Sequence, residues 1–113
     1  MINQGRQGGD RTERRAYARL PIVEVIQLQH PAGPQLASTR DLSLGGVGVV
    51  VEKPPPYGSK VNVAMEIEGA GRVDLMSVVV RLGSTVGLRF TSLTPSESFT
   101  LQEFLARRST SAS

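Results

Sequence analysis

The sequence predicts an all-β domain: a small six-stranded antiparallel β-barrel with one C-terminal helix, preceded by a flexible basic N-terminal arm. Three observations lead to this prediction. Six short apolar or alternating segments follow one another at hairpin spacing, with turn residues between them. A helix-capping motif stands only after the sixth segment. The chain has 113 residues, which is enough for one domain with one core.

Three strands are predicted in the first half of the chain. Residues 21–29 (PIVEVIQLQ) are rich in β-branched and apolar side chains, as strands are. The turn residues 30–34 (HPAGP) separate them from a returning strand at residues 35–40. Residues 41–46 (DLSLGG) are then expected to turn the chain into a short apolar strand at residues 47–51.

Three more strands are predicted after a proline-rich connection. The prolines of residues 54–58 (PPPYG) lack the N–H group that a central strand needs. Residues 60–68 (KVNVAMEIE) alternate apolar and polar side chains with a period of two, which indicates one buried face. Residues 72–82 alternate in the same way, and residues 86–91 (VGLRFT) form the last strand.

A helix is predicted after the last strand. Thr94 can act as the N-cap, Pro95 suits the first helical position, and Glu97 completes a capping box. One apolar helical stripe follows, made of Leu101, Phe104 and Leu105. We expect the helix to stop near Arg108, before a disordered Ser/Thr-rich tail at residues 109–113.

The charge of the chain is concentrated at its N-terminal end. We expect residues 1–13 to be a flexible arm and residues 14–108 to be the barrel domain with its helix. Residues 1–19 carry five arginines and two acidic residues, whereas the remaining 94 residues carry eight basic and eight acidic side chains. A basic arm suits a compact anion or a nucleic acid as its partner; a solubilising tail is the alternative interpretation.

The composition argues against several classes of protein. There is no cysteine and only one histidine, His30, so no disulfide, thiolate zinc site or multi-histidine metal site is expected. No apolar run reaches the length of a membrane span, and no signal peptide is evident, so we expect a cytoplasmic protein. No Ser/His/Asp set or paired catalytic carboxylate indicates an enzyme.

Five residues carry the chemistry of a candidate ligand site. Arg15 and Arg19 are four residues apart, and a guanidinium group binds phosphate and stacks on bases. Asp41 offers paired acceptors for the N–H edge of guanine, Ser43 offers a hydroxyl, and Gly46 lets the backbone come close. These residue types together suit a guanine attached to phosphate. Asp41 and Ser43 could also do no more than form a turn.

The pattern resembles the PilZ domain family of bacterial cyclic di-GMP receptors. The family motif RxxxR falls on Arg15 and Arg19, and the motif (D/N)xSxxG falls on residues 41–46. The strand VGLRF at residues 86–90 and the capped helix after it also resemble the family. The similarity covers almost the whole chain, from about Glu13 to about Arg108, and it implies the same barrel and helix.

The resemblance implies a role for each motif residue. Arg15 and Arg19 would contact the phosphates and guanines of cyclic di-GMP, and Asp41 would accept from guanine N1 and N2. Ser43 would bind a phosphate or the base, and Gly46 would keep the floor of the site open.

Two neighbouring residues are secondary candidates, Arg14 and Gly45. A basic residue before RxxxR implies a stacked dimer of the ligand, because a third guanidinium can satisfy the added phosphates and guanines; Arg14 could instead be solvated. Gly45 could serve a bulge as well as the site. Arg81 and Arg89 are weaker candidates for bordering the site.

The function implied by the resemblance is that of a non-enzymatic receptor and adaptor. The arm would fold over cyclic di-GMP, and the new surface would recruit a protein partner in motility, biofilm or exopolysaccharide control. Two alternatives stay open at this point. One is a barrel that binds single-stranded nucleic acid, although stacking aromatics are few; the other is a PilZ fold that contacts proteins without binding nucleotide.

Overall fold

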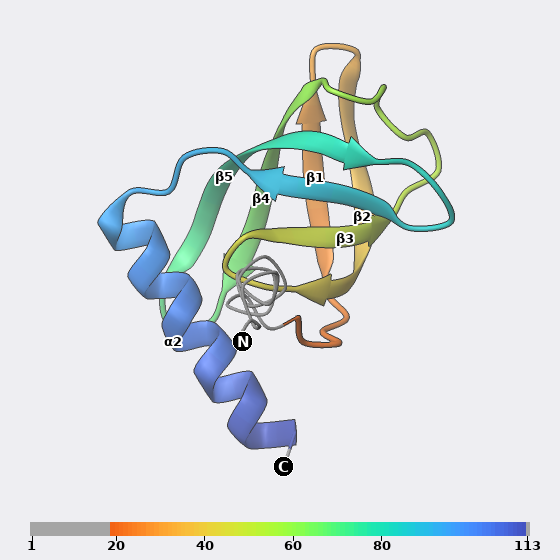
Figure 1. The fold of residues 1–113 in the computed structure, drawn as a ribbon. Helices are drawn as coiled ribbons and strands as arrows, with labels where there is room; N and C mark the ends of the chain where they lie inside the picture. Colours follow the sequence, from red (N-terminus) through yellow and green to blue (C-terminus); the bar gives the residue numbers. More distant parts are fainter. Residues whose placement is uncertain (1–18, 113) are drawn as a thin grey trace, which may run out of the picture.

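The computed structural model describes residues 19–112, which form a closed six-stranded antiparallel barrel followed by one helix (Figure 1). The predicted fold class is therefore confirmed. The elements are β1 (Val25–His30), β2 (Gly33–Leu42), β3 (Gly46–Val50), β4 (Lys60–Ile67), β5 (Gly71–Arg81), β6 (Val86–Phe90) and α2 (Pro95–Ala112).

The strands close on themselves in the order β1-β2-β3-β6-β5-β4. β4 pairs with β1, from Gln27 opposite Ala64 to Gln29 opposite Asn62, and this pairing completes the barrel. β3 pairs with β6 and not with β4, which follows it in the sequence. The proline-rich connection therefore carries the chain to the opposite side of the barrel, where β4 lies between β5 and β1. Closure gives every strand two neighbours and leaves no unpaired sheet edge.

The core is formed by the alternating apolar side chains that point into the barrel and by one stripe of α2. Its fully buried members include Leu28, Val47, Val63 and Leu75. The helix adds Leu101 and Phe104, which are buried in the same cluster. Leu105 is partly buried against the same cluster, so the helix packs against the barrel through the predicted stripe.

The first strand begins four residues later than predicted, at Val25. Residues 20–24 run beside β2 without forming a regular ladder. Leu20 exchanges two backbone hydrogen bonds with Leu42, both of 3.0 Å. Farther along, the hydroxyl of Thr39 donates to the carbonyl of Ile22 and accepts from the N–H of Glu24. The hydroxyl of Thr39 thus replaces backbone groups that would pair with this segment in a regular ladder. Residues 20–24 are therefore irregular, although their composition favours a strand.

The second strand is longer than predicted at both ends. It begins at Gly33, whose φ of 130° is accessible to glycine, and the turn before it contains only Pro31 and Ala32. Pro34 is tolerated because β3 pairs with β2 only from Ser38 onward. At the other end, β2 includes Asp41, so this residue lies in the strand and not in the turn that follows.

The predicted capping box opens α2. The N–H of Glu97 donates to the hydroxyl of Thr94 at 3.1 Å, and the N–H of Thr94 donates to the Glu97 carboxylate at 3.0 Å. The prediction of its end was wrong, because the helix continues from Arg108 to Ala112. No glycine or proline stands in residues 109–112 to stop it. Ser113, the last residue of the expected tail, lies outside the described residues.

Arg108 ties the helix to the segment that leads into β1. Its guanidinium donates to the carboxylate of Glu24 at 2.6 Å and lies 5.0 Å from the centre of the Phe104 ring. Both members of the ion pair are about one-third exposed. One arginine thus connects α2, the core and residues 20–24.

Replacing Arg108 with alanine is expected to lower the free energy of unfolding by about 1 kcal/mol, because a partly buried ion pair and a cation–π contact are lost together. Urea denaturation measures this loss. Arg107→Ala is the matched control, since Arg107 is more exposed and its contacts are longer: an ion pair with Glu103 at 3.9 Å and a hydrogen bond to the carbonyl of Glu68 at 3.3 Å. Equal losses for the two variants would contradict this account of Arg108.

Candidate functional site

Asp41 lies at the end of β2, on the outer face of the barrel. A register shift between Thr39 and Asp41 places Asp41 directly opposite Gly48 of β3. The carboxylate oxygens lie 2.9 and 3.2 Å from the point that a Cβ atom on Gly48 would occupy. Any side chain at position 48 would therefore collide with the carboxylate. Gly48 leaves the space in which the Asp41 side chain lies across the neighbouring strand.

Arg19 and Asp41 form an ion pair between residues that are 22 positions apart. Nη2 and Nε of Arg19 donate to the same oxygen, Oδ1 of Asp41, at 2.6 and 3.1 Å. The Arg19 side chain is 46% exposed and that of Asp41 29%. Among the described residues, none donates a hydrogen bond to Oδ2, so this oxygen is an open acceptor. The structure thus brings one residue of each predicted motif together.

Ser43 is buried and shapes the turn between β2 and β3. Its hydroxyl oxygen accepts hydrogen bonds from the N–H groups of Gly45 and Gly46, at 3.1 and 3.2 Å. Its own N–H donates to the carbonyl of Gly46 at 2.9 Å. The side chain is only 1% exposed. This is the turn role that the sequence left open for Ser43, and it holds the loop next to Asp41 in one conformation.

Gly46 is required by the close approach of β3 to β6. A Cβ atom there would lie 2.2 Å from the carbonyl oxygen of Leu88 and 3.2 Å from Cα of Arg89. The contact is with backbone, which cannot move aside without breaking the ladder. Its neighbour Gly45 accepts a hydrogen bond from the N–H of Phe90 at 2.9 Å. Both glycines therefore join the turn to β6.

A groove of about 520 Å³ opens beside this turn. Arg19 and the turn residues 43–45 form one side, and residues 89–93 at the end of β6 form the other. Arg89 is exposed, and its side chain makes no hydrogen bond or ion pair with any described residue. The groove thus has a cation on each side.

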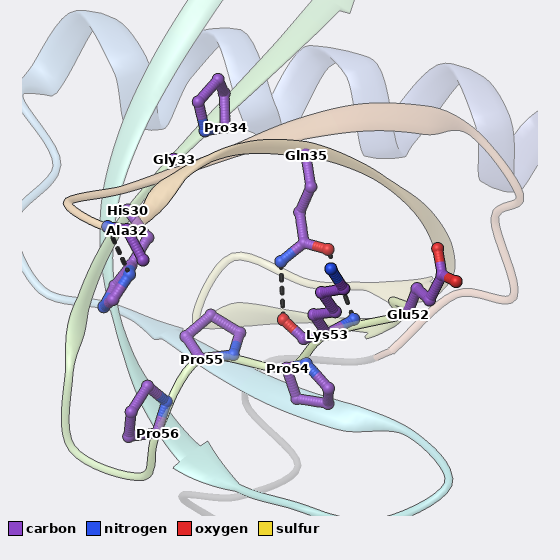
Figure 2. A pocket seen from close by; sticks show the side chains of 10 residues that line it. All are labelled: His30, Ala32, Gly33, Pro34, Gln35, Glu52, Lys53, Pro54, Pro55 and Pro56. Carbon is purple, nitrogen blue, oxygen red and sulfur yellow. Dashed lines mark hydrogen bonds between the residues drawn. The ribbon is translucent and has the colours of Figure 1, made fainter.

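A second hollow of about 470 Å³ lies at the other end of β2 (Figure 2). The hairpin tip at residues 30–35 and the proline-rich segment 52–56 line it. Gln35 fixes the two segments to each other, because its amide exchanges hydrogen bonds with the backbone of Lys53 at 2.6 and 3.3 Å. None of the predicted site residues lies there. His30 accepts from the N–H of Ala32 at 3.1 Å, as an ordinary turn residue does.

The remaining predicted site residues, Arg14 and Arg15, lie outside the described residues. The first motif is therefore represented in the structure by Arg19 alone. Sequence reasoning missed the relation between Asp41 and Gly48. The signal was the alternation in GVGVV, which places Gly48 on the outer face, but the partner strand and its shifted register are not visible in the sequence.

Within residues 19–112, the helix α2 is not long and apolar enough to span a membrane. In the same range, no group of three or more His, Asp or Glu side chains is arranged to hold a metal ion.

The sequence model of the PilZ domain matches residues 13–107, nearly the full chain. The chain belongs to the PilZ domain family. A search of curated proteins gives no match.

Solved structures share the PilZ fold at low sequence identity. The motility inhibitor MotI/DgrA of Bacillus subtilis has a TM-score of 0.76 at 18% identity, over 87% of this chain and 52% of its own. YcgR of Escherichia coli in complex with c-di-GMP has a TM-score of 0.73 at 19% identity, over 88% of this chain and 47% of its own. The separate PilZ domain of YcgR with c-di-GMP is covered to 97%, with a TM-score of 0.69 at 18% identity. The chain thus spans about half the length of MotI/DgrA and of YcgR.

Replacing Gly46 with alanine is expected to destabilise the fold by about 1–3 kcal/mol, because the added methyl group meets the backbone of β6. Thermal or urea unfolding measures the change. Gly83→Ala is the control, since a Cβ atom there would meet only the carbonyl oxygen of Thr85, at an ordinary 3.8 Å. A Gly46→Ala variant as stable as Gly83→Ala would show that β3 and β6 are not held this closely in solution.

Proposed function

We propose that this PilZ domain is a receptor for cyclic di-GMP and that the ligand binds over the Arg19–Asp41 pair. The observation that carries the proposal is this pair, which joins one residue from each family motif beside an open groove. Family membership supports the ligand class, and two structural neighbours from Escherichia coli are solved with c-di-GMP.

The chemistry of the pair fits the ligand. Cyclic di-GMP presents guanine N–H donors and two phosphates. The open Oδ2 of Asp41 accepts from guanine N1 and N2, while Arg19 turns toward a phosphate or stacks on a base. Arg15 adds a second guanidinium, and Arg14 a third where the ligand binds as a stacked dimer. Ser43 and the glycines 45 and 46 hold the loop against which the ligand rests.

The free energies favour exchange of the pair for the ligand. An exposed ion pair stabilises a protein by only about 0.2–1 kcal/mol, so releasing Arg19 from Asp41 costs little. A hydrogen bond to a charged group contributes about 1.5–3 kcal/mol. A few such bonds, less the cost of ordering the arm, reach the roughly 8 kcal/mol of a micromolar complex. The pair therefore keeps Asp41 in place for the ligand without a large penalty.

We further propose that the domain acts as an adaptor without catalysis in the cytoplasm. Ligand contact with Arg14, Arg15 and Arg19 would change the conformation of the arm, and a protein partner would bind the surface that the arm and the ligand form together. The structural similarity to MotI/DgrA, an inhibitor of motility, supports an output in motility, and biofilm or exopolysaccharide control is the related alternative.

Calorimetry tests the proposed ligand. Cyclic di-GMP is expected to bind saturably, whereas GMP, cyclic di-AMP and a single-stranded oligonucleotide are not. Arg19→Ala and Asp41→Ala should each weaken binding about tenfold or more, equivalent to about 1.4 kcal/mol.

The matched control is Arg72→Ala, because Arg72 is also an exposed arginine in an ion pair but lies at the far end of β5. Its affinity should equal that of the wild type. Absence of heat with wild-type protein at high micromolar cyclic di-GMP would refute the proposal. Length-dependent oligonucleotide binding that weakens steeply with salt would favour a nucleic-acid protein instead.

A further inference from the structure

An acidic and a basic side chain stand at the two ends of one row across four strands. Asp41 of β2 is opposite Gly48 of β3, and Gly48 is opposite Gly87 of β6. Gly87 in turn is opposite Arg81, the last residue of β5. The neighbours of the glycines, such as Val47 and Leu88, are buried in the core, so the row lies on the outer face of the barrel.

Arg81 folds back over Gly87 as Asp41 lies over Gly48. Its Cβ, Cζ and Nη1 atoms lie 3.1, 3.2 and 3.4 Å from the point that a Cβ atom on Gly87 would occupy. A register shift between Val79 and Arg81 brings Arg81 to this position. Both charged side chains thus lean toward the middle of the row, over adjacent strands.

The guanidinium of Arg81 has no partner among the described residues. Arg81 is exposed, and it makes no hydrogen bond or ion pair within residues 19–112. Arg72, at the other end of the same strand, is paired with Asp74 at 3.1 Å. Asp41 and Arg81 do not pair with each other either. The row therefore carries an open acceptor at one end and a set of planar donors at the other, and the methyl group of Thr85 lies 3.1 Å from the point that a Cβ atom on Gly48 would occupy.

We propose that one guanine of the ligand lies over this row, with Asp41 on its N1 and N2 donors and Arg81 on its O6 and N7 acceptors. The proposal rests on the proposed function and adds a residue that selects the base. Arginine forms a bidentate pair with O6 and N7 of guanine, and this geometry requires the planar fork of the guanidinium. Adenine carries an amino donor at C6 and an acceptor at N1, so it mismatches both ends of the row.

A double-mutant cycle between Arg81 and the base tests the proposal. The probes are cyclic di-GMP and its analogue with 7-deazaguanine, which lacks the N7 acceptor. Arg81→Ala and Arg81→Lys should each weaken cyclic di-GMP binding about tenfold, because lysine keeps the charge but not the fork. Wild-type protein should bind the 7-deaza analogue less tightly, and Arg81→Ala should bind both ligands equally.

The outcomes separate this inference from the function on which it rests. If wild-type protein binds cyclic di-GMP but Arg81→Lys binds as tightly as the wild type, Arg81 is not a bidentate donor and the inference is overturned. The same conclusion follows if the 7-deaza analogue loses as much affinity in Arg81→Ala as in the wild type. Arg72→Ala is the control for a general loss of positive charge on β5 and should change neither affinity. If the wild type binds no cyclic di-GMP, the proposed function itself is overturned.

Discussion

The position of the Asp41 carboxylate depends on the glycine that faces it. Asp41 lies across β3 only because Gly48 has no side chain, and the register shift in β2 puts the two residues opposite each other. Arg19 then closes on the carboxylate from the segment that precedes the barrel. β3 also lies close to the backbone of β6 at Gly46, so the ion pair lies over closely packed backbone. The parts of the site that can move are the side chains of Arg19 and Asp41.

The same segment connects the site to the helix. Residues 20–24 follow Arg19 directly; they bond to Leu42 and Thr39 of β2, and Glu24 bonds to Arg108 of α2. The contacts along this path are a few backbone hydrogen bonds and one exposed ion pair, without a regular ladder. Such contacts hold a segment in place but can be exchanged at low cost. A ligand that takes Arg19 from Asp41 therefore acts on the least regular part of the barrel, and that part is also bound to α2.

The sequence was sufficient for the order of strands and helix but not for several of their ends. β-Branched and apolar content, period-two alternation and turn residues together identified all six strands, and the capping box at residues 94–97 identified the start of α2. Residues 21–24 look like strand, yet their partners are the side chain and backbone of Thr39, a long-range contact that local composition does not reveal. In the site, family motifs pointed to Arg19 and Asp41, while the place of Arg81 depends on two register shifts that only the paired strands show.

The arrangement of charge on the barrel favours a small ligand over a nucleic-acid strand. Of the seven arginines in residues 19–112, four are in ion pairs, and the unpaired ones are Arg40, Arg81 and Arg89. Arg40 precedes Asp41 in the chain, Arg81 ends the row that Asp41 begins, and Arg89 lines the groove beside Arg19. A strand of nucleic acid needs a long basic track and a series of stacking aromatics, whereas the exposed aromatics within residues 19–112, Tyr57 and Phe99, lie apart on a loop and on the helix. A few unpaired guanidinium groups around one carboxylate match instead a compact anion that also carries N–H donors.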